Sequence, residues 1–184
     1  MHQTIFIQGM CYSGKTTLGT LLAQRLNTKF LDSRYIFFNQ WGIYDLDYLN
    51  KYGQEKFQDA EKLSLQQEFN EQGVGVVALS GSTLYLTGIM DNFYENSHKN
   101  LIIWLDVSFD IILFRKNREG TERPIVYPDG INSFEELYTS RRSIYEKYSH
   151  LNVVIEMSDT KEQVVEKVID AIKRHQTTKG SVLL

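Results

Sequence analysis

The sequence has little of what marks several large classes of protein. Among its 184 residues there is one cysteine, Cys11, which excludes an internal disulfide, and there are only two prolines. No apolar run approaches the ~20 residues that a membrane-spanning helix needs. The start, MHQTIFIQG, has no basic segment of the kind that begins a secretory signal, and the four histidines are too scattered for a zinc site. We therefore expect a cytoplasmic protein with no membrane partner.

The chain also lacks an excess of positive charge. Its 20 Lys and Arg residues are outnumbered by 23 Asp and Glu residues, giving a formal net charge of -3 and no general attraction to nucleic acid. A composition of 42% hydrophobic and 23% charged residues is that of an ordinary globular protein. We predict a single domain over residues 1–175 and a flexible tail over 176–184. We expect a monomer or a weak dimer that does not bind nucleic acid.

Short apolar runs alternate with longer segments of helical periodicity, a pattern typical of strands and helices in a mostly parallel sheet. The predicted strands are residues 4–8, 29–31, 74–79, 101–105 and 153–156. The predicted helices are residues 15–26, 55–72, 108–118, 133–148 and 160–175. The last two helices begin with capping pairs, Ser133 with Glu136 and Thr160 with Gln163. The pattern indicates a three-layer α/β fold in which helices flank a five-stranded parallel sheet.

A phosphate-binding loop follows the first predicted strand. The segment GMCYSGKTT satisfies G-x-x-x-x-G-K-[ST] with Gly9, Gly14, Lys15 and Thr16. The glycines allow backbone N–H groups to turn toward a phosphate, and the helix that follows adds partial positive charge. Lys15 would reach the β- and γ-phosphates, while the Thr16 hydroxyl would bind Mg²⁺. We therefore predict binding of ATP and Mg²⁺. The residues expected to surround the triphosphate are Gly9, Met10, Cys11, Tyr12, Ser13, Gly14, Lys15, Thr16 and Thr17, and Cys11 is assigned no chemistry.

Over nearly its whole length the sequence resembles the shikimate kinase family. The phosphate loop and its helix, GMCYSGKTTLGTLLAQRL, lead into KFLDS, where the family has a strand ending in Asp-x-Asp. YGQEKFQDAE is similar to the family's Phe-Arg-x-x-Glu segment. ERPIVYPDGINSFEELYTSRRSIYEKY is similar to its Arg-Pro lid and Arg-x-Pro-x-Tyr segment, with Ser143 in place of that segment's proline. The resemblance implies a phosphate-loop kinase with a mobile lid at about residues 119–132, which transfers the γ-phosphoryl group of ATP to a small molecule.

The resemblance also implies catalytic roles for Lys15, Asp32 and Arg123. Asp32 matches the family's carboxylate for Mg²⁺, a group that suits a hard cation, although the same residue could instead cap the next helix. Arg123 matches the lid arginine that closes over the transferred phosphoryl group, where a guanidinium would stabilise charge on the oxygens. The alternative for Arg123 is a solvated surface position.

Further basic residues have two interpretations each. Arg141 matches the arginine that holds the substrate carboxylate, but Arg142 is adjacent, and one of the two is expected to be a surface charge. Arg115 and Lys116 fall near the position of the family's adenine-binding arginine, and we predict that they bind ATP. A solvated helix face would explain them, and the nearby Arg118, equally well.

Three departures fall on residues that contact shikimate in the family. Arg34 replaces the second carboxylate of Asp-x-Asp, Gln58 replaces the arginine of Phe-Arg-x-x-Glu, and Ser80, Gly81 and Ser82 replace a three-glycine loop. These five residues remain the predicted acceptor site, together with Arg141. Arg34 would favour an anionic acceptor if it faces the site, or it could turn to solvent or pair with Asp32.

Three functions follow as hypotheses. The first is a shikimate kinase-like enzyme that acts on a small anionic acceptor, with shikimate as the leading named candidate. The second is a kinase of the same fold for a nucleoside, nucleotide or sugar acid, and the third is a nucleotide-binding protein without transfer activity. An aromatic-rich segment would either stack on a flat acceptor or form core. Its members are Tyr35, Phe37, Phe38, Trp41, Tyr44, Tyr48 and Tyr52.

Overall fold

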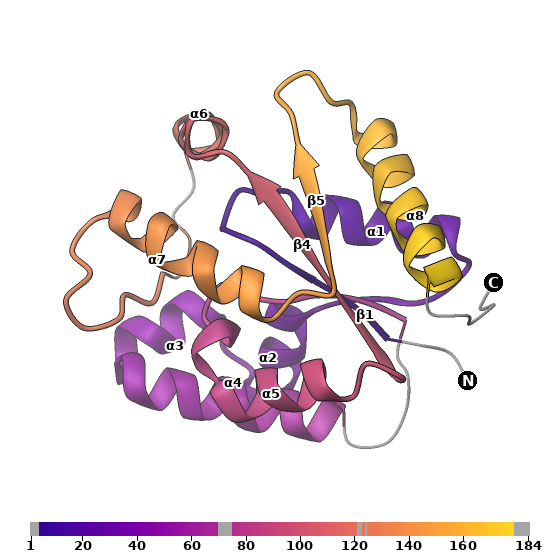
Figure 1. The fold of residues 1–184 in the computed structure, drawn as a ribbon. Helices are drawn as coiled ribbons and strands as arrows, with labels where there is room; N and C mark the ends of the chain where they lie inside the picture. Colours follow the sequence, from indigo (N-terminus) through magenta and orange to yellow (C-terminus); the bar gives the residue numbers. More distant parts are fainter. Residues whose placement is uncertain (1–3, 70–74, 121–122, 124, 179–184) are drawn as a thin grey trace.

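The computed structural model describes residues 4–69, 75–120, 123 and 125–178. Five strands form one sheet in the order β2-β3-β1-β4-β5, and every neighbouring pair is parallel. The strands are β1 (Thr4–Gln8), β2 (Phe30–Asp32), β3 (Val76–Ala78), β4 (Asn100–Val107) and β5 (Leu151–Ile155). The predicted fold class is confirmed, because helices cover both faces of this sheet (Figure 1).

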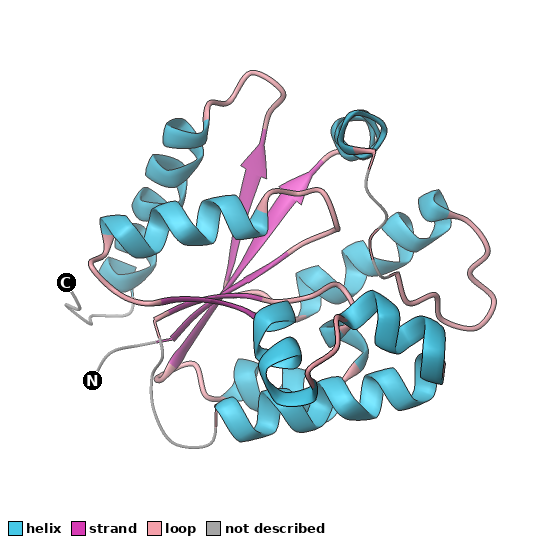
Figure 2. Cartoon of the chain, turned by 180° about the vertical axis from the view of Figure 1, so that it is seen from behind, coloured by secondary structure: helices cyan, strands magenta, loops and turns pink. Residues whose placement is uncertain are grey.

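Eight α-helices and one short 3-10 helix connect the strands within the described residues. They are α1 (Lys15–Arg25), α2 (Ser33–Trp41), α3 (Asp45–Tyr52), α4 (Gln54–Glu68), η1 (Thr83–Tyr85), α5 (Thr87–Glu95), α6 (Phe109–Glu119), α7 (Phe134–Lys147) and α8 (Lys161–Thr178). Figure 2 shows the same helices on the two sides of the twisted sheet from behind. No helix in the described part of the chain is long and apolar enough to cross a membrane.

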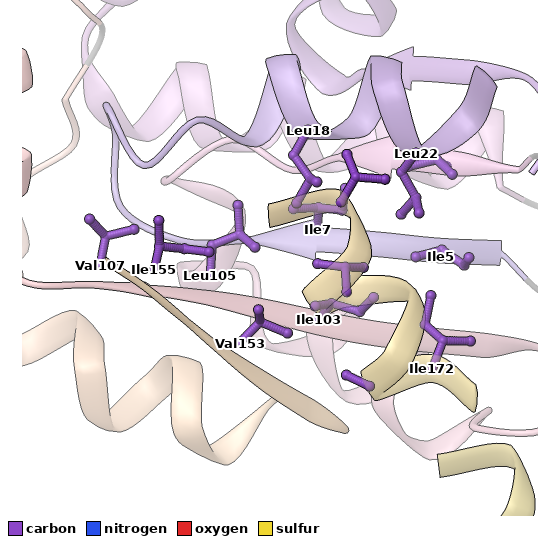
Figure 3. Close-up of a cluster of buried hydrophobic side chains, with 14 of the residues drawn as sticks. Ile5, Ile7, Leu18, Leu22, Ile103, Leu105, Val107, Val153, Ile155 and Ile172 are labelled. Atoms are coloured by element: carbon purple, nitrogen blue, oxygen red, sulfur yellow. The ribbon is translucent and has the colours of Figure 1, made fainter. Parts of the chain in front are cut away.

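Strand β1 lies at the centre of the sheet, and its side chains alternate between two cores. Ile5 and Ile7 pack in the core beneath α1 and α8, where Leu18, Leu22 and Ile172 meet them (Figure 3). Phe6 points to the opposite face, into the core closed by α4, α5 and α7. A strand that is buried on both faces must be apolar at every position of its interior, which explains the run IFI.

The chain visits the sheet in an order that creates a crevice at the carboxyl ends of the strands. From β1 it passes to β2 and β3 on one side, then crosses to β4 and β5 on the other. Ligands of open parallel sheets bind at such a reversal, outside the carboxyl ends of the strands. The segments that follow β1, β2 and β3 all emerge there, and they carry most of the predicted site.

Element boundaries differ from the prediction at several points. Helix α8 continues to Thr178, three residues into the predicted tail, because the Thr177 and Thr178 hydroxyls donate to main-chain oxygens one turn earlier. The rest of that tail, 179–184, lies outside the described residues. The helix predicted at 55–72 ends at Glu68, and its last positions, 70–72, are likewise not described. Helices α3 and α5 have no counterpart among the predicted segments, and α2 was foreseen only as an unbounded helix after Asp32.

Candidate active site

The phosphate loop is shaped by its two glycines. Gly9 has φ 151°, and a Cβ on it would lie 3.0 Å from the Ser13 Oγ and 3.1 Å from the Leu105 carbonyl oxygen. Gly14 takes the left-handed conformation, φ 96°, directly before α1. The first N–H groups of a helix have no acceptor within the helix. The loop therefore presents free main-chain donors at the positive end of the α1 dipole, as a bound phosphate requires.

Lys15 is held over this loop. Its ammonium group donates to the carbonyl oxygens of Gly9 (2.8 Å) and Met10 (3.0 Å). Burial lowers the pKa of Lys15 from 10.5 to about 8, although the negative charge of Asp32 opposes the shift. A buried amine whose charged form is disfavoured in this way gains most from an anionic ligand. The loop also contains a buried hydroxyl, Ser13 Oγ, that has no hydrogen-bond partner among the described residues.

Asp32 caps α2, one of its two interpretations, and it also contacts Thr16, while its metal role stays a prediction. One carboxylate oxygen caps α2 by accepting the N–H of Arg34 at 3.0 Å, and the other accepts the Thr16 hydroxyl at 2.7 Å. The cap fixes the carboxylate at the mouth of β2, beside the hydroxyl that phosphate loops offer to a metal. Asp32 is 6% exposed, so few of its contacts are with water.

These two oxygen ligands fit Mg²⁺. No group of three or more His, Cys, Asp and Glu side chains that could hold a metal occurs in the described part of the chain. Mg²⁺ bound to a nucleotide needs no such cage, because it keeps several waters and takes one or two protein oxygens together with phosphate oxygens. Thr16 and Asp32, hydrogen-bonded to each other, are the residues that would hold it.

Arg115 lies against the phosphate loop. It donates to the carbonyl oxygens of Ser13 (3.0 Å) and Tyr12 (3.3 Å), and burial lowers its pKa. Lys116 points elsewhere, with its ammonium group 5.5 Å from the centre of the Phe134 ring. Arg118 is exposed but lines the same cavity as Arg115. The ATP-binding role of both Arg115 and Lys116 stays a prediction.

Arg123 is tied to the phosphate loop through an aromatic ring. Its guanidinium lies 5.3 Å from the centre of the Tyr12 ring and forms an ion pair with Glu119 at the end of α6. Tyr12 is itself unusual, since it is a non-glycine residue with φ 65° within the loop. The predicted lid at about 119–132 begins with this last residue of α6, but 121, 122 and 124 lie outside the described residues, and its mobility stays a prediction.

A cavity of about 700 Å³ joins these residues to the predicted acceptor side. Of the predicted site residues, it is lined by Cys11, Tyr12, Ser13, Gly14, Lys15, Thr16, Thr17, Asp32, Arg34, Ser80, Gly81, Ser82, Arg115 and Arg123. Those that do not line it are Gly9, Met10, Gln58, Lys116 and Arg141. Gly9 and Met10 contribute main-chain oxygens beneath Lys15. Most of the predicted site is thus brought to one place.

At the acceptor end, Arg34 pairs with a residue that the sequence did not single out. Its Nε lies 2.6 Å from Asp45 Oδ2 and its Nη2 lies 3.0 Å from Asp45 Oδ1. Arg34 therefore lines the cavity and pairs with Asp45 in place of Asp32, while its side chain stays 40% exposed. The sequence indicates Asp45 only indirectly. The change from a carboxylate to Arg34 at a buried edge calls for a new counterion, and Asp45 and Asp47 were available in the next helix.

The serines that replace glycine at Ser80 and Ser82 have a partner in Glu61 of α4. Ser80 and Thr83 both donate to Glu61 Oε1, the latter at 2.9 Å, and the two serine hydroxyls are 2.8 Å apart. Glu61 is 4% exposed, and burial raises its pKa. Its other oxygen, Oε2, has no partner among the described residues. Gln58 stands where the family pattern has arginine, and it supplies no positive charge. The hydroxyl groups of Ser80 and Thr83 stabilise the Glu61 carboxylate.

Among the residues that the structure describes, Arg141 is the largest fully buried side chain, with 2% exposure. It donates to the Tyr85 hydroxyl (2.9 Å) and the Val126 carbonyl (3.0 Å), and it pairs with no carboxylate among the described residues. A Cβ on Gly81 would lie 2.6 Å from Arg141 Nη1. The guanidinium therefore lies directly behind the backbone of Gly81, which separates it from the cavity.

Arg142 is the surface residue of the adjacent pair. Its two terminal nitrogens lie 2.5 Å and 3.0 Å from the carboxylate oxygens of Asp106, and its guanidinium lies over the Trp104 ring. Arg141 consequently remains the only one of the two beside the acceptor end.

The aromatic-rich segment does not line the cavity. Phe37 is buried and packs against Tyr48, Trp41 and Phe57, while Phe38 stacks on Tyr44. Of the described aromatic residues in this region, only Phe57 of α4 reaches the cavity wall. The core interpretation holds for Phe37, whereas four members of the segment are exposed: Tyr35, Trp41, Tyr44 and Tyr52.

The fold and the loop together define a class of protein, the phosphate-loop kinases. Residues 12–173 match the family described as shikimate kinase, and the chain belongs to that family. It is therefore an ATP-dependent phosphotransferase.

Individual relatives cover almost the whole chain. A shikimate kinase from Sulfurihydrogenibium sp. (strain YO3AOP1) is 27% identical over 172 residues, covering 94% of this chain and 99% of that protein. One from Rippkaea orientalis is 31% identical over 176 residues, covering 91% and 87%. The structure of the Acinetobacter baumannii enzyme in complex with shikimate superposes with a TM-score of 0.80 at 21% identity, covering 96% of each chain.

Proposed function

We propose that this protein transfers the γ-phosphoryl group of ATP, with Mg²⁺, to a hydroxyl of a small anionic acceptor, and that shikimate is the first acceptor to test. The observation that carries the anionic acceptor is Arg141. A buried guanidinium without a carboxylate partner is costly unless a ligand supplies the negative charge. Gly81, which has no side chain, lines the cavity and lies directly against that guanidinium.

The nucleotide side follows from the phosphate loop. The loop N–H groups and Lys15 would hold the phosphates, with Mg²⁺ at Thr16 and Asp32. The metal neutralises charge on the phosphate oxygens when it is bound. Arg123, near the loop through Tyr12, would stabilise charge that spreads over the transferred group. Positioning and charge stabilisation carry most of such a transfer, so the missing carboxylate at position 34 does not exclude it.

The acceptor side supports a second candidate, a kinase of the same fold with another acceptor. Arg34, Ser80 and Ser82 change both the charge and the hydrogen-bonding groups of the wall. A nucleoside, a nucleotide or a sugar acid would use such hydroxyl and guanidinium groups. A protein that only binds nucleotide is the remaining candidate. It predicts that no acceptor stimulates the release of ADP.

A coupled assay of ADP release tests these candidates. Wild-type protein and MgATP are supplied with shikimate, gluconate or adenosine, and Lys15→Ala serves as the control that should lose turnover by about 100-fold or more. Stimulation by shikimate supports the first candidate, and stimulation by another acceptor supports the second. MgATP binding without stimulation by any of them would overturn the kinase proposal. Full activity of Lys15→Ala would overturn the assigned role of the loop.

A further inference from the structure

The reversal of charge at position 34 does not remove a carboxylate from the acceptor end of the cavity. Arg34 and Asp45 form a two-point ion pair, and both residues line the cavity. The Arg34 side chain is 40% exposed, whereas that of Asp45 is 4% exposed. A carboxylate buried to this degree needs a partner that compensates for its lost hydration. Arg34 provides that compensation at the cavity wall.

Asp45 lies close to the other polar groups of the acceptor end. It lines the same cavity as Ser80 and Ser82, and its negative charge is one of the causes that raise the pKa of Glu61. Glu61 in turn binds the hydroxyls of Ser80 and Thr83. The first residue of α3 therefore reaches the same wall as the loop after β3, although the two are far apart in the sequence.

The hydrogen bonds of Asp45 leave one acceptor position open. Oδ1 accepts from Arg34 Nη2 and from the N–H of Leu46, each at 3.0 Å. Oδ2 accepts only from Arg34 Nε among the described residues. An ionised carboxylate has about four acceptor positions. The remaining one belongs to Oδ2, on a residue that lines the cavity.

We propose that Asp45, held by Arg34, contacts the acceptor hydroxyl that receives the phosphoryl group, a contact that the family pattern assigns to the carboxylate at position 34. This inference rests on the proposed kinase function. In the transfer, the hydroxyl oxygen bonds to the γ-phosphorus while the bond to the β,γ-bridging oxygen breaks. ADP keeps that electron pair, and the hydroxyl proton passes to Asp45 and then to solvent.

A purely structural role for the pair predicts something different. The ion pair connects α2 to α3. If it served only to hold these two helices together, breaking it would change only the stability of the protein. Breaking it from either side would then have equal effects. If Asp45 contacts the acceptor, loss of the carboxylate lowers kcat much more than loss of the guanidinium does.

The experiment compares Asp45→Asn with Arg34→Gln. ADP release is measured at saturating MgATP with whichever of shikimate, gluconate and adenosine gives the highest wild-type rate. We expect kcat to fall about 10- to 100-fold in Asp45→Asn, the range for a lost hydrogen bond to a charged group. The fall in Arg34→Gln should be at least fivefold smaller, and the Kd of MgATP should be unchanged in Asp45→Asn.

A matched control is Asp106→Asn, which breaks a similar arginine–aspartate pair outside this cavity. It should leave kcat unchanged, and thermal unfolding of both Asn variants shows how much of any loss is due to stability. Equal falls in kcat for Asp45→Asn and Arg34→Gln, or no fall in the former, would overturn the inference alone. A wild-type protein that binds MgATP but turns over none of the three acceptors would overturn the kinase function, and the inference with it.

Discussion

At the scale of single residues, burial of Lys15 links nucleotide binding to pH. The pKa of Lys15 is about 8 in the folded protein, against 10.5 for the free side chain. The phosphates of ATP favour its charged form. We therefore expect the affinity for MgATP to fall as the pH rises above 8, by up to about tenfold per unit. Titrations between pH 7 and 9.5 measure this dependence.

The same shift has the opposite sign for stability. Without ligand, the folded protein releases the Lys15 proton near pH 8, while the unfolded chain keeps it until 10.5. The contribution of Lys15 to stability is therefore fully present above pH 10.5 and is lost as the pH falls through 8.

Lys15→Arg, which stays charged throughout, is the control for the binding prediction and should bind MgATP with little pH dependence. A flat profile for the wild type would contradict the prediction.

Gly81 and Gly88 make a matched pair for testing the wall in front of Arg141. A Cβ at Gly81 would lie 2.6 Å from Arg141 Nη1, and Tyr85 and Val126 hold this guanidinium in place. We expect Gly81→Ala to destabilise the protein by about 1–3 kcal/mol and to raise the acceptor KM about tenfold, because the charge is displaced.

The control is Gly88→Ala in the first turn of α5. An added Cβ there meets nothing within 4 Å. Helical alanine is favoured over glycine, so this variant should gain up to about 1 kcal/mol with unchanged kinetics. Denaturant unfolding and steady-state kinetics compare the two. Equal behaviour of the variants would show that Gly81 is not a close contact of Arg141.

At the scale of elements, the strands and the longer helices were predicted well and the short helices were not. All five strands fall within a few residues of their predicted positions, because buried parallel strands form apolar runs bounded by turns. Helix α3 has only eight residues, and its segment reads as an aromatic-rich connection. Helix α5 does have an apolar face, formed by Ile89, Met90 and Phe93, which the sequence interpretation missed. The apolar pattern of α5 is too short to be recognised as a helix from the sequence without the strand against which the helix packs.

Helix α7 offers a direct test of a predicted cap. The Ser133 hydroxyl accepts the N–H of Glu136, and the Glu136 carboxylate accepts the N–H of Ser133, which confirms the capping box. We expect Ser133→Ala to lower the free energy of unfolding by about 1 kcal/mol. Ser143→Ala, in the exposed interior of the same helix, should change it by less than about 0.5 kcal/mol. Urea unfolding measures both, and equal losses would contradict the cap's contribution.

At the scale of the whole molecule, the nucleotide half of the site was predictable and the acceptor half was not. The phosphate loop is a continuous segment whose glycines and lysine are readable as one motif. The acceptor end is assembled from α2, α3, α4 and the loop after β3. The partners of its changed residues, Asp45 as the counterion of Arg34 and Glu61 as the hydrogen-bond acceptor of Ser80, come from separate elements. A single sequence gives residue types but not these pairings, so the departures at Arg34 and Ser80 looked independent of their surroundings.

The pairings predict how the family's acceptor pattern can be restored. Arg34→Asp alone would remove the partner of Asp45 and place a second carboxylate beside it, which should destabilise the protein by several kcal/mol. Adding Asp45→Asn removes the repulsion, and Gln58→Arg gives Glu61 a positive charge on the same helix, α4. The triple variant should therefore be more stable than Arg34→Asp with Gln58→Arg, and it should phosphorylate shikimate faster than wild type. Urea unfolding and ADP release measure the two effects. If the triple variant is folded yet no faster with shikimate, the acceptor is a different small molecule.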